Sequence, residues 1–425
     1  MWLSKNFIFT LTGLFIGFSI TGCGGGGSSG GGSPGAIMAL KQTTSSGSSI
    51  AGFSVSSFVS AETPVTGTTS TGTLSNTFGI TPPSNTTFTG IAFDKNGNLW
   101  VTEAPTSYVN CSPGSPNPSS TTSTIVEYSA SSLSNGAPST TGQTVTVTGV
   151  VDGIAFDSTG DLWITVSSGN NNSSCTGGFV SMYPVLSNGN ISGTASFTIT
   201  SPFSNSTGYQ PIFVLFDSSG NLWISNANVG SGTGPILEYS KSVIPPHSTT
   251  GSASTPSLTF STTVGTDTQL FQGAAFDKQG NLWAGVICSY THNTQCTHYF
   301  SHVVEFKAST ISGLITTGGT VSQPPDYTFQ VPGTASAPTN SAYISNDTYI
   351  AGGAGFDSGG NLWVTVGALS NSTGSIDLSA SPYLFQYASS ILGTTAPLPI
   401  NEFTLSKGAI GFWAFWPIPT GLPLY

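Results

Sequence analysis

An aspartate, a glycine and a tryptophan recur together five times in this sequence of 425 residues. The first copy reads GIAFDKNGNLWVTE and the second reads GIAFDSTGDLWITV. A ring of such carboxylates would suit metal binding or proton transfer. An aspartate followed by x-x-Gly also caps a tight turn, because its oxygens accept backbone N–H groups and glycine adopts the positive φ of the reversal. The spacing favours this structural interpretation for Asp94, Asp157, Asp217, Asp277 and Asp357.

The aromatic and acidic residues that recur beside these aspartates are also interpreted as structural. We expect the repeated tryptophans to pack between neighbouring elements rather than to bind sugars. They are Trp100, Trp163, Trp223, Trp283 and Trp363. Glu127, Glu238 and Glu305 recur later in their repeats, where we expect solvated charges at an outer edge.

Polar residues at the ends of predicted strands form a second group of candidates. Carboxylate and amide oxygens suit a hard divalent cation, so this group is the best candidate for a ligand or metal site. The alternative is that they are polar loop residues that face water. The candidates are Glu103, Asp152, Asn226, Asn228 and Asp347.

Cysteine and histidine residues offer a third chemistry. In an exported protein the cysteines are expected to form disulfides, and Cys111–Cys175 with Cys288–Cys296 is the favoured one of three pairings. The stretch CSYTHNTQCTHYFSH at 288–302 also offers borderline-soft ligands, so zinc is the alternative. Its histidines are His292, His298 and His302.

The elements that must position all these residues are β-strands. Each copy reads as strand, turn and strand, and the copies begin at residues 90, 153, 213, 273 and 353. A third strand follows each copy, as in IVEYSASS at 125–132, and a fourth precedes the next, as in QTVTVTG at 143–149. Four antiparallel strands in each repeat, arranged around a centre, predict the blades of a β-propeller.

A sixth blade is expected from the two ends of the chain. AFWPIPTGLPLY at 414–425 resembles the repeated hairpin and would supply the first and second strands. FSVSSFVSAE at 53–62 would supply the third strand, and TLSNTFG at 73–79 the fourth. We therefore predict an all-β, six-bladed β-propeller that the termini close. The alternative is a five-bladed ring with the termini as decoration.

The repeated hairpin resembles the NHL repeat and the related streptogramin-lyase and gluconolactonase-type (SMP-30-like) propellers, over residues 90 to 390. The resemblance implies a propeller whose ligands bind around the central channel, on the face opposite the aspartate turns. It also implies an alternative function as a metal-dependent lyase or lactonase, with Ca²⁺, Mg²⁺ or Zn²⁺ as cofactor. No cofactor is expected otherwise, because no residues match a complete family site.

The N-terminus has the features of an export signal. Lys5 precedes the apolar segment FIFTLTGLFIGFSI at 7–20, which ends in ITGC. This ending resembles a bacterial lipobox, which implies that residues 1–22 are removed and that Cys23 carries fatty acyl chains such as palmitate. The Gly/Ser-rich segment that follows predicts a flexible tether at 23–50, with the propeller at 51–425. The alternative is an ordinary secretory signal or an uncleaved anchor.

The charge of the chain restricts its partners. Only 6% of the residues are charged, all seven basic residues are lysines, and the net charge is −10. Nucleic acid is therefore not an expected partner, because phosphate binding requires clustered positive charge. We expect a lipid-anchored binding or scaffold module of the cell envelope, with a protein, peptide or glycan partner. In a Gram-negative cell, Gly24 after the lipidated cysteine favours the outer membrane or the cell surface.

Overall fold

The computed structural model describes most of the predicted repeats. The described residues are 18–19, 37–44, 47–54, 70–72, 77–106, 122–167, 178–203, 209–228, 234–244, 251–253, 255–264, 267–288, 300–331, 348–357, 359–369, 382–394, 397, 399–404 and 409–416.

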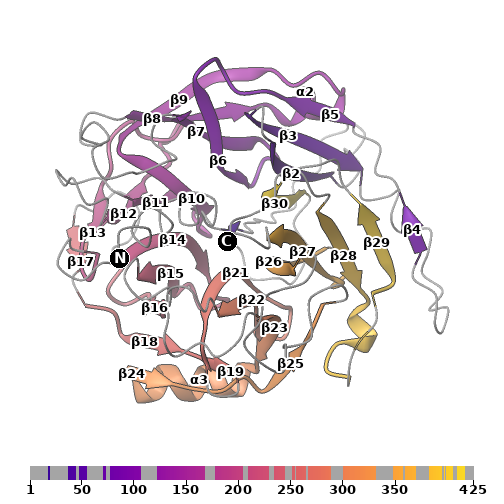
Figure 1. The fold of residues 1–425 in the computed structure, drawn as a ribbon. Coiled ribbons are helices and arrows are strands. Elements are labelled where there is room, and N and C mark those ends of the chain that lie inside the picture. The colour runs from indigo at the N-terminus through magenta and orange to yellow at the C-terminus, as the bar shows by residue number, and fades with distance from the viewer. Residues whose placement is uncertain are drawn as a thin grey trace, which may run out of the picture.

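Six small antiparallel sheets stand around a central axis and form a six-bladed β-propeller (Figure 1). In each blade, the strand nearest the axis is followed outward by the second, third and fourth strands. We number the blades from the first complete repeat. The predicted fold class and the number of blades are confirmed.

Blades 1 to 5 follow one another along the chain. Blade 1 contains β6 (Thr86–Phe93), β7 (Leu99–Pro105), β8 (Thr122–Tyr128) and β9 (Thr140–Thr148). Blade 2 contains β10 (Val150–Phe156), β11 (Leu162–Ser167), β12 (Gly178–Tyr183) and β13 (Phe197–Ile199). Blade 3 contains β14 (Tyr209–Phe216), β15 (Leu222–Asn228), β16 (Ile236–Tyr239) and β18 (Leu258–Ser261). Blade 4 contains β21 (Leu270–Phe276), β22 (Leu282–Cys288), β23 (Phe300–Phe306) and β25 (Tyr327–Phe329). Blade 5 contains β26 (Thr348–Phe356), β27 (Leu362–Leu369), β28 (Tyr383–Tyr387) and β29 (Asn401–Thr404).

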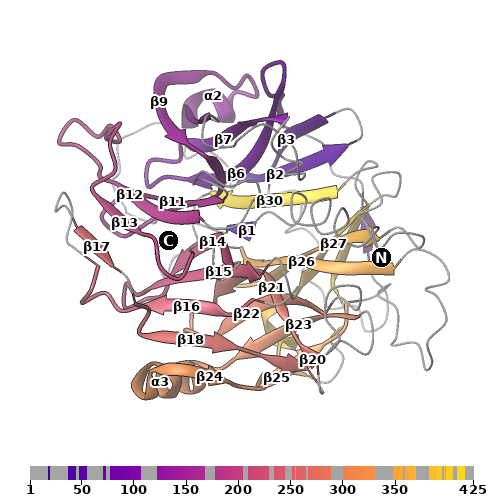
Figure 2. The same ribbon diagram turned by 60° about the vertical axis from the view of Figure 1, so that its left-hand side comes forward.

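The two ends of the chain combine in blade 6, as predicted, but they divide it differently. The C-terminal segment supplies only the inner strand, β30 (Ala409–Trp416). The N-terminal segment supplies the other three: β2 (Ile37–Thr44), β3 (Gly47–Ser54) and β5 (Phe78–Ile80). Figure 2 shows β30 beside β2.

The predicted boundary of the propeller at residue 51 lies inside β3, and the propeller strands begin at Ile37. The predicted second strand from the C-terminus would fall at 417–425, outside the described residues. The sequence predicts that β2 belongs to the tether, because Met38 and Ala39 occupy the positions on the second strand where the other blades have Leu-Trp. Blade 6 therefore lacks the signature of the repeat on its second strand.

Neighbouring blades also share their outer edges. β17 (Gly251–Ala253), from the chain of blade 3, pairs in parallel with β13 of blade 2. β24 (Gly319–Ser322) and β4 (Ser70–Gly72) likewise pair with the outer strands of blades 3 and 5. Covering an exposed strand edge protects it from pairing with another molecule.

One short strand lies at the centre of the ring. β1 (Phe18–Ser19) pairs in parallel with β21 at Gly273 and Ala274 and contacts the inner strand of every blade (Figure 2). β1 belongs to the segment that the sequence predicts to be an export signal. Removal of residues 1–22 would take β1 out of the ring.

The repeated aspartate holds the hairpin between the first and second strands. Asp94 Oδ1 accepts the backbone N–H groups of Asn96 and Asn98 at 2.8 and 3.0 Å. Its Oδ2 accepts Asn98 Nδ2 at 2.9 Å and the Trp100 indole N–H at 3.1 Å. Gly97 has a φ of 83°, a conformation that glycine adopts without a steric penalty. The same aspartate–tryptophan bond, at 2.8 to 3.1 Å, recurs in blades 2 to 5.

Each of these tryptophans also joins its blade to the next. The Trp100 ring packs edge-on against Phe156 of blade 2, with 5.8 Å between ring centroids. Three further interfaces repeat this contact at 5.6 to 6.3 Å, through Trp163–Phe216, Trp223–Phe276 and Trp283–Phe356. The hydrophobic core is therefore a series of layers between blades, and inner strands such as β10 are buried along their whole length.

We expect Asp94→Ala to lower the free energy of unfolding by about 2–3 kcal/mol, because several buried donors, including the indole N–H, lose their acceptor. Urea denaturation measures this change. Asn96→Ala, in the exposed part of the same turn, is the matched control and should change stability by about 0.5 kcal/mol or less. Equal effects of the two substitutions would contradict the role assigned to the carboxylate.

Candidate functional site

The structure describes four of the five candidates at the strand ends. Asn226 on β15 is fully buried, and its Nδ2 donates to the Pro235 carbonyl at 2.6 Å. Asn228 is the last residue of the same strand and pairs with Tyr209. Glu103 on β7 is half-buried, and burial raises the pKa of its carboxyl group. Asp347 lies outside the described residues.

Asp152 interacts electrostatically with a lysine that the sequence did not single out. Asp152 lies at the register shift of β10 and is 3% exposed. Burial raises its pKa to about 7, while Ser167 and the charge of Lys41 oppose that rise. Burial lowers the pKa of Lys41 on β2 to about 8, against the opposing effect of Asp152. These two residues therefore link blades 2 and 6 electrostatically.

Lys41 occupies a position that carries a hydroxyl group in four other blades. By strand register, it corresponds to Thr102, Thr165, Ser225 and Thr365. The Thr165 hydroxyl accepts the Gly153 N–H at 2.7 Å and donates to the Ile212 carbonyl of the next blade at 2.9 Å. This position therefore connects blades, and in blade 6 a buried lysine occupies it.

The predicted cysteine and histidine site falls mostly outside the described residues. Cys288 ends β22, opposite Phe300, and His302 on β23 pairs with Val286. Burial lowers the pKa of His302. Within the described ranges, no group of three His, Cys, Asp or Glu side chains is close enough to hold a metal ion. The remaining members lie outside the described residues: Cys23, Cys111, Cys175, Cys296, His292 and His298.

The glutamates of the third strand are not solvated edge charges, so that expectation was wrong. Glu127 and Glu305 are each 7% exposed, and Glu238 is fully buried. Each stands directly opposite the tryptophan of its own blade in the strand register. The cause is that both faces of every sheet are covered by neighbouring blades, so alternation along a strand does not bring a side chain into water.

These buried glutamates differ in their partners. Glu127 accepts Asn98 Nδ2 at 2.7 Å and the Thr141 hydroxyl. In blade 5 the equivalent residue is Gln386, which donates to Asp357 Oδ2 at 3.0 Å. Among the described residues, no hydrogen bond reaches the side chain of Glu305. Burial and the nearby Asp277 carboxylate raise its pKa.

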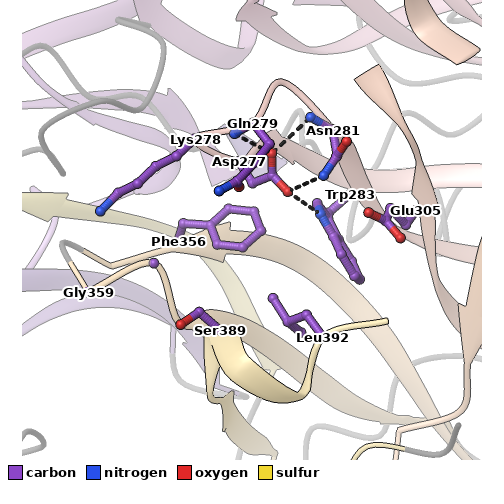
Figure 3. A pocket seen from close by; sticks show the side chains of 11 residues that line it. Asp277, Lys278, Gln279, Asn281, Trp283, Glu305, Phe356, Gly359, Ser389 and Leu392 are labelled. Carbon is purple, nitrogen blue, oxygen red and sulfur yellow. Dashed lines mark hydrogen bonds between the residues drawn. The ribbon is translucent and has the colours of Figure 1, made fainter. Parts of the chain in front are cut away.

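Glu305 lines a cavity of about 300 Å³ between blades 4 and 5, where it lies beside Trp283 (Figure 3). Blade 4 contributes Asp277 and Trp283 beside it. Blade 5 contributes five further lining residues, which are Phe356, Gly359, Gly360, Ser389 and Leu392. The cavity opens on the face of the aspartate turns, which is not the face where the sequence placed the candidate site.

Beside the cavity, the connection after the third strand of blade 5 is short. In blade 4 that connection forms α3 (Ala308–Thr317), whose Ile311 and Leu314 pack into the core beside Trp223 of blade 3. In blade 5 it forms only the single 3-10 turn η5 (Ser389–Ile391), followed by the partly buried Leu392. The space beside Trp283 is therefore less completely filled than the space beside Trp223.

The sequence contains a signal for this difference, although it identifies no ligand. The third strand is followed by ASTISGLITT at 308–317 in blade 4 and by ASSILGTT at 388–395 in blade 5. The first segment forms the ten-residue helix α3, and the second forms only the three-residue turn η5. The two segments can be recognised as equivalent only after the strand register shows that both pack against the preceding blade.

No helix among the described residues is long and apolar enough to cross a membrane. No protein-family model matches this sequence, and no curated protein matches it.

Several solved structures are similar to this chain in fold. A protein of unknown function from Bacteroides caccae is 8% identical, with a TM-score of 0.47, over 90% of this chain and 99% of that chain. A putative gluconolactonase is 12% identical, with a TM-score of 0.36, over 80% and 87% of the two chains. A gluconolactonase from Xanthomonas campestris is 11% identical, with a TM-score of 0.32, over 71% and 82%. Similarity this low carries no information about activity.

We expect Glu238→Gln to remove a pH-dependent loss of stability. Burial and the nearby Asp217 raise the pKa of Glu238 to about 7, so the folded protein retains a proton that the unfolded chain releases near its ordinary value of 4.5. Stability therefore falls as the pH rises from about 4.5 to 7.

At pH 8 the glutamine variant should be more stable than the wild type by about 2 kcal/mol, and at pH 4 the difference should disappear. Urea denaturation at both pH values measures it. A difference that does not depend on pH would show that the carboxylate of Glu238 carries no penalty.

Proposed function

We propose that this protein is a binding module of the cell envelope, anchored by a lipid on Cys23, that recognises its partner through the cavity between blades 4 and 5. The main support for this proposal is the environment of Glu305. Its carboxylate lines the cavity and, among the described residues, receives no hydrogen bond, whereas Glu127 and Gln386 are bonded at the same strand position. In blade 3 the oxygens of Glu238 also lack a hydrogen bond within the described part of the chain, but they are enclosed, whereas Glu305 borders the cavity, where a ligand can reach its carboxylate.

The lining of the cavity suits binding rather than catalysis. Both oxygens of Asp277 already accept N–H groups, from Gln279, Asn281 and the Trp283 indole, at 2.8 to 3.0 Å. The remaining lining combines apolar side chains from both blades with polar groups of the turn, and its accessible part is more polar than apolar. A concave site with a carboxylate that is free to accept hydrogen bonds can recognise a ligand that carries donors.

The proposed anchor is supported by the N-terminal sequence. The apolar segment at 7–20, the cysteine that follows it, and the Gly/Ser-rich stretch after the cysteine occur in the order of a lipoprotein signal. A tether of this composition would hold the propeller away from a membrane and leave its faces accessible.

We expect Cys23→Ala to abolish incorporation of a palmitate analogue and to move the protein from the membrane fraction to the soluble fraction. Metabolic labelling and cell fractionation measure the two effects. Cys288→Ala is the matched control and should leave both unchanged. A Cys23→Ala protein that remains labelled and membrane-bound would refute the anchor.

The binding role is tested by filling the cavity. We expect Leu392→Trp to abolish binding to ligands that the wild type selects from peptide and glycan arrays, because the larger side chain occupies the space beside Trp283. Ile244→Trp is the matched control, since Ile244 follows the third strand of blade 3 at the same distance and is also partly buried. Arrays that give no ligand distinguishing these two variants would overturn the proposed site.

A further inference from the structure

The charged groups that act on Glu305 are more negative than positive. Asp277 and Asp326 raise the pKa of Glu305, and Lys307 lowers it. With Glu305 itself, these groups comprise three carboxylates and one ammonium group. The backbone N–H of Lys307 donates to Asp326 Oδ2 at 2.8 Å, which holds these two residues together beside the third strand.

The other lysine near the cavity does not neutralise Glu305. Lys278 lies in the exposed part of the aspartate turn, at the mouth of the cavity. In Figure 3 its side chain extends to the side of Phe356 and Gly359, and Glu305 lies on the opposite side, beside Trp283. Lys278 therefore does not neutralise the part of the cavity beside Glu305.

The approach to Glu305 combines polar and apolar groups, and the accessible lining is more polar than apolar. Trp283 and Phe356 are each only 2% exposed, so little of either ring is accessible to a ligand, and the partly buried Leu392 lies across from them. A ligand that reaches the carboxylate needs a hydrogen-bond donor at its tip. An alkyl chain that ends in an ammonium group carries such a donor, because its stem is apolar and its head is charged.

We propose that the cavity binds the lysine side chain of a basic peptide, with the ammonium group donating to Glu305 and the aliphatic stem beside Leu392. This inference rests on the proposed binding function and names its ligand. The net charge of −10 and the absence of arginine make the whole chain complementary to a basic partner. A neutral sugar would use the same hydrogen-bonding atoms, but it would leave the excess of negative charge uncompensated.

The test uses three small probes with the full chain: Nα-acetyl-lysine methylamide, its uncharged counterpart Nα-acetyl-norleucine methylamide, and methyl N-acetylglucosaminide. Saturation-transfer NMR and calorimetry measure binding to the wild type, Glu305→Gln and Glu127→Gln. The last variant is the matched control, because Glu127 has the same strand position but is already hydrogen-bonded.

We expect the lysine probe to bind the wild type and Glu127→Gln equally, and to bind Glu305→Gln about tenfold or more weakly, since a charge-assisted hydrogen bond is lost. The norleucine and sugar probes should not bind. Thermal unfolding at pH 8 should show Glu305→Gln to be as stable as the wild type or more stable, because the substitution removes a buried negative charge beside Asp277. This readout separates loss of the ligand from loss of the fold.

Equal binding of the lysine and norleucine probes would overturn the inference. So would unchanged binding to Glu305→Gln, or no saturable binding of the lysine probe to the wild type. If the sugar probe binds instead and Leu392→Trp abolishes that binding, the proposed binding function stands and only the choice of ligand fails. If no probe or array ligand depends on Leu392, both proposals fail.

Discussion

The hydrogen bond from the tryptophan indole to the aspartate of the same hairpin is the interaction on which the propeller depends. This bond holds the indole nitrogen 2.8 to 3.1 Å from a carboxylate oxygen in all five complete repeats. The same ring then meets a phenylalanine of the next blade in four interfaces. Because that phenylalanine immediately precedes the next aspartate, each turn positions one side of an interface, and the next turn positions the other. The circular arrangement follows from the repetition of one local motif, with both termini joined in blade 6.

Function depends on the places where this repetition is broken. The third strand carries Glu127, Glu238, Glu305 or Gln386 opposite the tryptophan, so most blades contain a buried polar group at the same point. In blade 1 this group accepts hydrogen bonds from Asn98 in the turn and from Thr141 on the fourth strand. In blade 5 it donates one to the aspartate of the turn, Asp357. In blade 4 the neighbouring blade offers only the short η5 turn, and Glu305 borders a cavity. A small difference in loop length thus converts a structural position into a proposed binding position.

The sequence predicted the features that depend on local pattern and missed those that depend on the relation between blades. The five hairpins follow from residues that are adjacent in the chain, and the two terminal segments each resemble part of one repeat, so the six-bladed fold was predictable. The start at Ile37 was not, because β2 has Met38-Ala39 instead of Leu-Trp and follows a Gly/Ser-rich stretch. The burial of the glutamates was missed because alternation along a strand does not reveal that both faces of a sheet are covered. The cavity was missed because α3 and η5 can be compared only after both are placed against the preceding blade. The candidates at the strand ends remain predictions where they lie outside the described residues, as Asp347 does.

The most direct test of this account is a titration of Glu305 itself. The sequence contains six glutamates, so selective ¹³C labelling of their carboxyl groups gives few signals, and Glu305→Gln assigns the relevant one. The account predicts that the pKa of Glu305 in the free protein lies above that of an exposed glutamate, and that saturation with the lysine probe lowers it, because a bound ammonium group favours the charged carboxylate. An ordinary pKa that the probe leaves unchanged would contradict the account.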